Sequence, residues 1–188
     1  MPKFVRQPPA VFEDSILVAG GEVDEYHICL GYYGDELNPD ELSALLGRKP
    51  TSSSLKGDLV NKNERTRIEN TGKWILRARE TPGEPLEPQI ADLLASMTAD
   101  LSVWRSLAKR FRVRFVVGAW IRSWNRGLEI SPELLRMLSD RDLGLGVDIY
   151  VDYDEGSAHQ VIGISGSQDG FPAPNRAAFA CTDHARSN

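Results

Sequence analysis

The chain has 188 residues, a length that favours a single domain with a sizeable buried core. Its apolar content of 41% and charged content of 26% are ordinary for a water-soluble globular domain, and its net charge is −5. No apolar run approaches the ~20 residues that a membrane span needs, and residues 16–19 are too short for a signal-peptide core. We therefore expect a cytoplasmic protein, in which a disulfide between its two cysteines, Cys29 and Cys181, is possible but not favoured.

Three regions of the chain differ in composition. Residues 1–22 are polar and Pro-rich, which predicts an N-terminal arm. Residues 23–153 carry regular apolar patterns and are expected to form one α+β domain. Residues 154–188 are rich in Gly, Ser, Pro and Ala, which predicts a C-terminal extension with one edge strand followed by a tail.

The first periodic segments are a strand and a short helix. Residues 24–33 alternate between apolar and polar side chains, which predicts a half-buried strand. Asn38 is a favoured N-cap residue, Pro39 suits the first helical position, and Gly47 suits the C-terminal stop. These signals predict a helix between Asn38 and Gly47.

The rest of the domain reads as strands that alternate with helices. Residues 49–67 are polar, with a short strand expected at residues 59–60, and residues 73–80 are expected to form a strand. An apolar stripe at three- and four-residue steps predicts one long helix over residues 87–110. The remaining elements are expected as a strand at 112–122, a helix that starts at Ser131-Pro132, and a strand at 145–153 with Leu145, Val147, Ile149 and Val151 facing inward.

The resulting order is β-α-(β)-β-α-β-α-β. Because the strands alternate and are not apolar throughout, one face of the sheet is expected to lack a helical cover. The sequence therefore predicts an α+β fold, in which helices pack on one face of a mostly antiparallel sheet.

Arginine, aromatic and acidic side chains occupy the strand positions that point away from the predicted core, and they define a candidate binding surface. Guanidinium groups bind phosphate or carboxylate, and aromatic rings anchor protein partners. The alternative is a solvated face on which Arg and Asp pair across strands. The candidate residues are Arg77, Arg79, Arg112, Arg114, Trp120, Arg122, Trp124, Asp148 and Tyr150, with His27 beside them.

Residues 101–128 contain seven cations and no acid, whereas the remainder of the chain is strongly acidic. Such a segment could follow a nucleic-acid backbone while Trp120 and Trp124 stack on bases. An acidic remainder repels a polyanion, so we regard nucleic-acid binding as the weaker interpretation.

The sequence contains no catalytic or metal-binding pattern that we can identify. The three histidines are scattered, and neither His-x-x-x-His nor Cys-x-x-Cys occurs. Residues 163–167 resemble a nucleophile elbow only superficially, because the last position is Ser. We therefore expect no catalytic residue, no metal and no cofactor.

Several short motifs, taken in order, resemble the bacterial domain-of-unknown-function family numbered 4279. The similarity covers about residues 24–153 and implies no activity, cofactor or site residue. The motifs are Leu46-Gly47-Arg48-Lys49-Pro50-Thr51, Lys56-Gly57-Asp58, Gly72-Lys73-Trp74, Ser131-Pro132-Glu133-Leu134-Leu135 and Val147-Asp148-Ile149-Tyr150.

From the residues themselves we expect a non-enzymatic module that binds a protein partner, for instance as an immunity or antitoxin-like protein. Arg and aromatic side chains are enriched at such interfaces, and an acidic chain would be steered toward a basic partner. The alternative is a small-ligand or phosphate-binding domain that uses Arg77, Arg112, Arg114 and the loop at residues 49–56. The chain is expected to be a monomer or a homodimer.

Overall fold

The computed structural model describes residues 21–62, 65–122 and 125–151. Nearly all of the expected N-terminal arm, the whole C-terminal extension and Trp124 lie outside the described residues. Within them, the chain folds around a five-stranded sheet of order β2-β5-β1-β6-β7. The strands are β1 (Glu25–Gly34), β2 (Ser52–Ser54), β5 (Gly72–Arg77), β6 (Arg112–Ile121) and β7 (Leu145–Val151).

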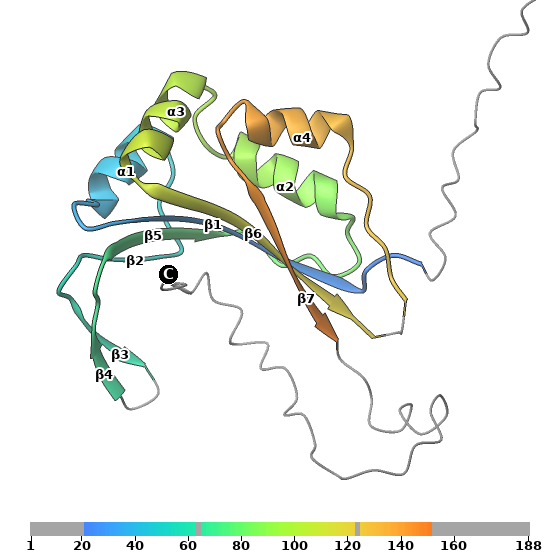
Figure 1. Ribbon diagram of the computed structural model, residues 1–188, viewed down its shortest axis with the longest axis horizontal. Coiled ribbons are helices and arrows are strands. Elements are labelled where there is room, and N and C mark those ends of the chain that lie inside the picture. Colours follow the sequence, from blue (N-terminus) through green and yellow to red (C-terminus); the bar gives the residue numbers. More distant parts are fainter. Residues whose placement is uncertain (1–20, 63–64, 123–124, 152–188) are drawn as a thin grey trace, which may run out of the picture.

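Every neighbouring pair in this sheet is antiparallel except β6 and β7, which are parallel. The helices are α1 (Pro39–Leu46), α2 (Leu86–Ala95), α3 (Leu101–Arg110) and α4 (Pro132–Ser139). Figure 1 shows them together on one face of the sheet. The main core lies between the two layers, and all four helices contribute to it. The predicted α+β fold is confirmed.

Helix α1 forms where its capping residues predict it. The Asn38 side-chain oxygen accepts hydrogen bonds from the backbone N–H groups of Asp40 and Glu41, at 2.9 and 3.3 Å. Gly47 ends the helix with φ of 70°, a left-handed conformation that costs glycine little. The Trp74 indole N–H donates to Ser43 Oγ at 3.0 Å, which ties α1 to β5.

The single long helix predicted over residues 87–110 is wrong. The chain leaves helical geometry after Ser96 and re-enters it at Leu101, so α2 and α3 are separate helices. Asp100 starts α3, since its carboxylate accepts from Ser102 N at 2.8 Å. The Trp104 indole N–H donates to Thr98 O at 2.9 Å and holds the turn against the core. The apolar stripe continues across the break, which is why periodicity alone did not reveal it.

The polar segment between α1 and β5 contains more structure than the sequence predicts. Strand β3 (Leu59–Lys62) confirms the expected short strand, but it pairs with a second strand, β4 (Arg65–Ile68), that was not expected. The two form a separate antiparallel hairpin. Figure 1 shows this hairpin standing off from the main sheet, on the side of β2 and β5.

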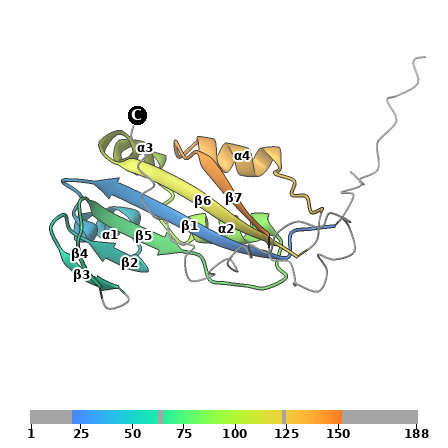
Figure 2. The same cartoon turned by 60° about the horizontal axis from the view of Figure 1, so that its bottom comes forward.

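Strand β7 lies at the opposite edge of the sheet from β2, as Figure 2 shows. Its odd-numbered residues lie on the helix-facing side, as predicted, but most of them are not buried. Only Leu145 packs against the main core, whereas Val147, Ile149 and Val151 are 36%, 65% and 38% exposed. Alternation places these side chains on the helix-facing side of the sheet, but it does not reveal how far the helices extend over the edge strand.

The cysteines also differ from the expectation. Cys29 lies on the central strand β1 and is fully buried. It is disulfide-bonded, which is the alternative that the sequence left open but did not favour. Cys181, the other cysteine of the chain, lies outside the described residues.

Candidate functional site

The sheet face opposite the helices carries most of the predicted binding residues. Strand register places Arg77 beside Cys29, Arg114 beside Gly31 and Arg112 beside Tyr33. It likewise places Trp120 between Glu25 of β1 and Tyr150 of β7, and Asp148 beside Gly118. Arg79 lies just beyond the end of β5, and Arg122 just beyond the end of β6. Register thus places the candidate residues that lie within β5, β6 and β7 on one face, and their role in binding stays a prediction.

Trp120 is the centre of an aromatic cluster on this face. Its ring stacks on Tyr150, with centroids 4.4 Å apart and planes 13° apart. On its other side the His27 ring lies at 4.3 Å, tilted by 46°. Trp120 is only 1% exposed, and it forms a second small core with Cys29, Tyr33, Ile75 and Val116. The expectation that Trp120 is exposed is wrong, and its part in binding stays a prediction.

The polar side chains beside this cluster interact with one another, with His27 lying between two carboxylates. His27 Nε2 lies 2.8 Å from Glu25 Oε1, and His27 Nδ1 lies 3.4 Å from Glu80 Oε1. Burial raises the pKa of Tyr150, and the negative charge of Asp148 adds to this effect. This arrangement fits a structural histidine between two carboxylates better than a catalytic base.

The cations of residues 101–128 do not form a continuous basic track. Arg110 pairs with Glu41 at 2.7 Å, Arg122 with Glu25 at 3.4 Å, and Arg126 with Asp24 at 3.2 Å. The side-chain hydrogen bond from Arg126 holds the pKa of Asp24 below its usual value. Arg112 lies with its guanidinium carbon 5.3 Å from the centroid of the Tyr33 ring. Acids from distant parts of the sequence thus pair with three of the seven cations, which weakens the nucleic-acid interpretation.

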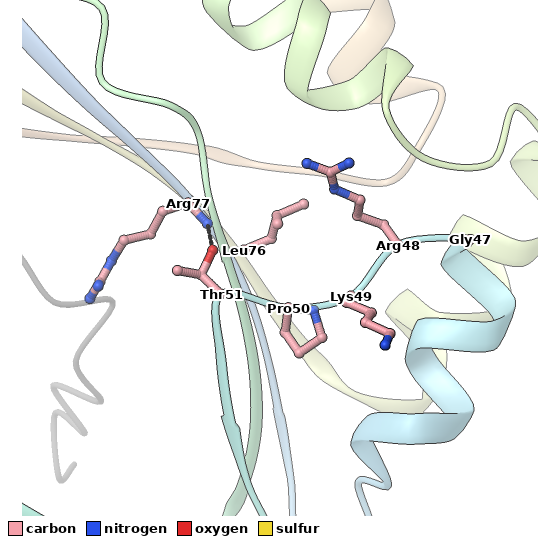
Figure 3. A pocket seen from close by; sticks show the side chains of 7 residues that line it. All are labelled: Gly47, Arg48, Lys49, Pro50, Thr51, Leu76 and Arg77. Atoms are coloured by element: carbon pink, nitrogen blue, oxygen red, sulfur yellow. Dashed lines mark hydrogen bonds between the residues drawn. The ribbon is translucent and has the colours of Figure 1, made fainter.

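An open hollow of about 520 Å³ lies where the end of α1 meets β5. Figure 3 shows its lining side chains: Arg48, Lys49, Pro50 and Thr51 from the loop after Gly47, with Leu76 and Arg77 from β5. Thr51 Oγ1 accepts from the backbone N–H of Arg77 at 3.0 Å, which joins the two segments.

A second hollow of about 320 Å³ adjoins the first, because both are lined by Arg48 and Arg77. Its lining adds Arg79, and it also includes the acids Glu84 and Asp92. Within the described part of the chain, no ion pair engages Arg48, Lys49, Arg77 or Arg79. The loop at residues 49–56 and Arg77 were expected as one alternative site, but Arg48 was not, since nothing in the sequence spacing links it to β5.

The β3–β4 hairpin presents an apolar surface. Leu59 and Ile68 face each other across the two strands and are 71% and 60% exposed. Leu55, just before the hairpin, is 48% exposed. We call these three residues the hairpin patch.

A buried acid anchors the base of this hairpin. Glu69 is 5% exposed, and its carboxylate accepts from Lys73 Nζ at 2.6 Å and from Arg67 at 3.1 Å. Its backbone N–H donates to Asp58 O at 2.9 Å, and its carbonyl accepts from Gly57 N at 2.7 Å. Burial alone would raise the pKa of Glu69, but the hydrogen bonds from Lys73 and Arg67 outweigh it, so the pKa is lowered.

The described residues contain no group of three or more His, Cys, Asp or Glu side chains placed to hold a metal ion. No described helix is long and apolar enough to cross a membrane. The described residues form an α+β domain with a five-stranded sheet, a separate two-stranded hairpin and helices on one face of the main sheet. The model of a family described as a domain of unknown function (DUF4279) matches residues 24–152, so the chain belongs to that family. The comparisons found no match among curated proteins or solved structures.

Replacing Trp120 with alanine should lower the free energy of unfolding by about 3–5 kcal/mol, because a fully buried aromatic side chain is lost. Urea denaturation at pH 7 measures this. Arg77→Ala, an exposed change on the same face, should alter stability by no more than about 0.5 kcal/mol. A Trp120→Ala variant of native stability would show that the side chain is not part of a core.

Glu69→Gln should destabilise the protein by about 1.5–3 kcal/mol at pH 7, since two charge-assisted hydrogen bonds to a buried acceptor are weakened. Because the folded pKa is lowered, this stabilisation is present above the unfolded value of 4.5 and is lost as pH falls through the folded pKa. Denaturation from pH 7 to pH 3 should therefore show the two stabilities converging at the acid end. Glu133→Gln, at an exposed pair on α4, is the control and should show no such convergence.

Proposed function

We propose that this protein is a non-enzymatic module that binds a protein partner through the hairpin patch. The observation that best supports this proposal is the pair of Leu59 and Ile68, two large aliphatic side chains that lie directly opposite each other and are more than half exposed. Apolar side chains grouped on a projecting element are typical of the centre of a protein interface.

The anchoring of the hairpin supports this proposal. An isolated two-stranded hairpin is at best marginally stable in water. Here the buried Glu69 network ties β4 to Lys73 of β5, which holds the apolar pair in a fixed place relative to the sheet. A surface that is already ordered pays less conformational entropy on binding. Arg67, with 71% of its side chain exposed, would supply a polar rim.

An immunity or antitoxin-like role is the narrower form of this proposal. Its support is the net charge of −5, which would favour encounter with a basic partner. The cytoplasmic location also stays a prediction.

The test combines partner identification with two matched variants. The full-length protein is used as bait, and the affinity of the purified partner is then measured by calorimetry. The double variant Leu59→Ser/Ile68→Ser should weaken binding at least tenfold while the melting temperature changes little, because both side chains are exposed. Leu135→Ser, which removes a 51% exposed side chain from α4, should bind like the wild type. Equal affinity of the double variant and the wild type would contradict the proposal.

A second candidate function is binding of a small anionic ligand in the hollow beside α1. Three cations line this hollow without an acid among its lining residues, and Thr51 adds a hydroxyl group. Figure 3 shows Arg48 and Arg77 extending to different sides, so a ligand would have to draw the guanidinium groups together.

This alternative can be measured directly with millimolar inorganic phosphate, nucleotides and sugar phosphates in a thermal-shift assay. Binding should raise the melting temperature of the wild type. The melting temperature of the Arg48→Gln/Arg77→Gln variant should not change, because this variant lacks the two guanidinium groups that would bind the anion. The Arg136→Gln variant, changed at an exposed pair on α4, should respond like the wild type. The absence of any shift in the wild type would remove this candidate.

A further inference from the structure

The side chains of strand β7 are more exposed to solvent than is usual for a strand in a parallel pair. It is parallel to β6, and parallel strands are usually covered on both faces. In β7, however, only Leu145 and Tyr150 are half-buried, and the other five residues are exposed. Ile149, at 65%, is the most exposed of the row Val147, Ile149 and Val151. This row leaves three β-branched apolar side chains facing solvent.

Within the described residues, the outer edge of β7 carries little of the usual protection against pairing with another strand, since Asp148 is its one charged residue. Within the described residues, β7 ends the sheet and pairs on one side only. Edge strands are commonly blunted by lysine, proline or a bulge. The β7 sequence LGVDIYV contains neither lysine nor proline, and its pairing with β6 runs without interruption from Leu145 to Val151. An edge of this kind is a template for a further strand.

The β7 sequence is self-complementary when two copies meet in antiparallel orientation. If Ile149 faces Ile149 of a second copy, Val147 faces Val151, and Asp148 faces Tyr150. The apolar row then pairs only with apolar side chains, and the acid faces a phenol. Centring the pairing on Asp148 would instead bring two acids face to face, which is destabilising.

We propose that this protein forms a homodimer in which the β7 strands of two copies pair antiparallel about a two-fold axis at Ile149. The axis is perpendicular to the sheet, so the two five-stranded sheets join into one and the helices of both copies lie on the same side. Each apolar row is covered by its counterpart. The hairpin patch lies toward the other edge of each sheet and stays free for a different partner.

The first experiment is the oligomeric state of the full-length protein, measured by sedimentation at several concentrations. The wild type should be a dimer, and Ile149→Lys should shift the dissociation constant at least tenfold toward monomer. Leu59→Lys, which places the same charge at a 71% exposed leucine on the hairpin, should remain a dimer. A wild type that stays monomeric up to high micromolar concentration overturns the proposal. So does an Ile149→Lys variant that dimerises as well as the wild type.

Cysteine cross-linking tests the register and does not depend on the lysine variant folding. Residues directly opposite each other across an antiparallel pair have Cβ atoms about 4.5–5.5 Å apart, close enough for a disulfide after small adjustments. Ile149→Cys should therefore give a covalent dimer on a non-reducing gel. Val147→Cys should not, because its counterpart is displaced by four residues, or roughly 13 Å along the strand. Cross-linking at residue 147 but not at 149 overturns this register. If neither variant cross-links, the proposed dimer is overturned. That is the result expected if residues 152–188 of the same chain cover the edge.

Discussion

The structure depends on the burial of β1 on both of its faces. This strand lies at the centre of the sheet and pairs with β5 on one side and β6 on the other. Its even-numbered residues Ile28, Leu30 and Tyr32 enter the main core under the helices, while Cys29 and Tyr33 enter the second core. A domain with helices on one face only must still remove the other face of its central strand from water. The aromatic cluster around Trp120 and the Tyr33 ring supply part of that cover.

This requirement changes how the predicted binding face should be interpreted. On a solvated face, a tryptophan flanked by arginines would be a natural anchor for a partner. In the structure, Trp120 is buried between Tyr150 and His27, and several of the cations pair with nearby acids or lie on aromatic rings. The same residue types that suggest binding in a sequence also build a polar and aromatic second core. Only burial distinguishes these two uses, and burial is a property of the whole fold.

How far the sequence predicts the fold depends on the range of the interactions involved. Helix α1 was predicted with both ends because Asn38 and Gly47 act within a few residues of themselves. The division between α2 and α3 was missed although Asp100 is a recognisable cap, because the continuous apolar stripe outweighed it. The Arg48–Arg77 hollow was predicted in part and the β3–β4 hairpin only as one strand. The hollow depends on contact between segments that are distant in sequence, whereas the hairpin is local and was missed because its largely polar residues show no regular alternation.

The exposed row on β7 is the most instructive of these differences. Alternation correctly assigned Val147, Ile149 and Val151 to the helix side of the sheet, yet four helices of eight to ten residues do not cover all five strands. An α-helix rises about 1.5 Å per residue, so the longest of them spans about 15 Å. Five strands spaced about 4.8 Å apart span nearly 20 Å between the outer strand axes, before side chains are added. The uncovered apolar surface falls on β7, at the edge of the sheet opposite β2. The exposed apolar side chains of β7 and of the β3–β4 hairpin therefore lie toward the two edges of the sheet, whereas Trp120 on the face opposite the helices is buried.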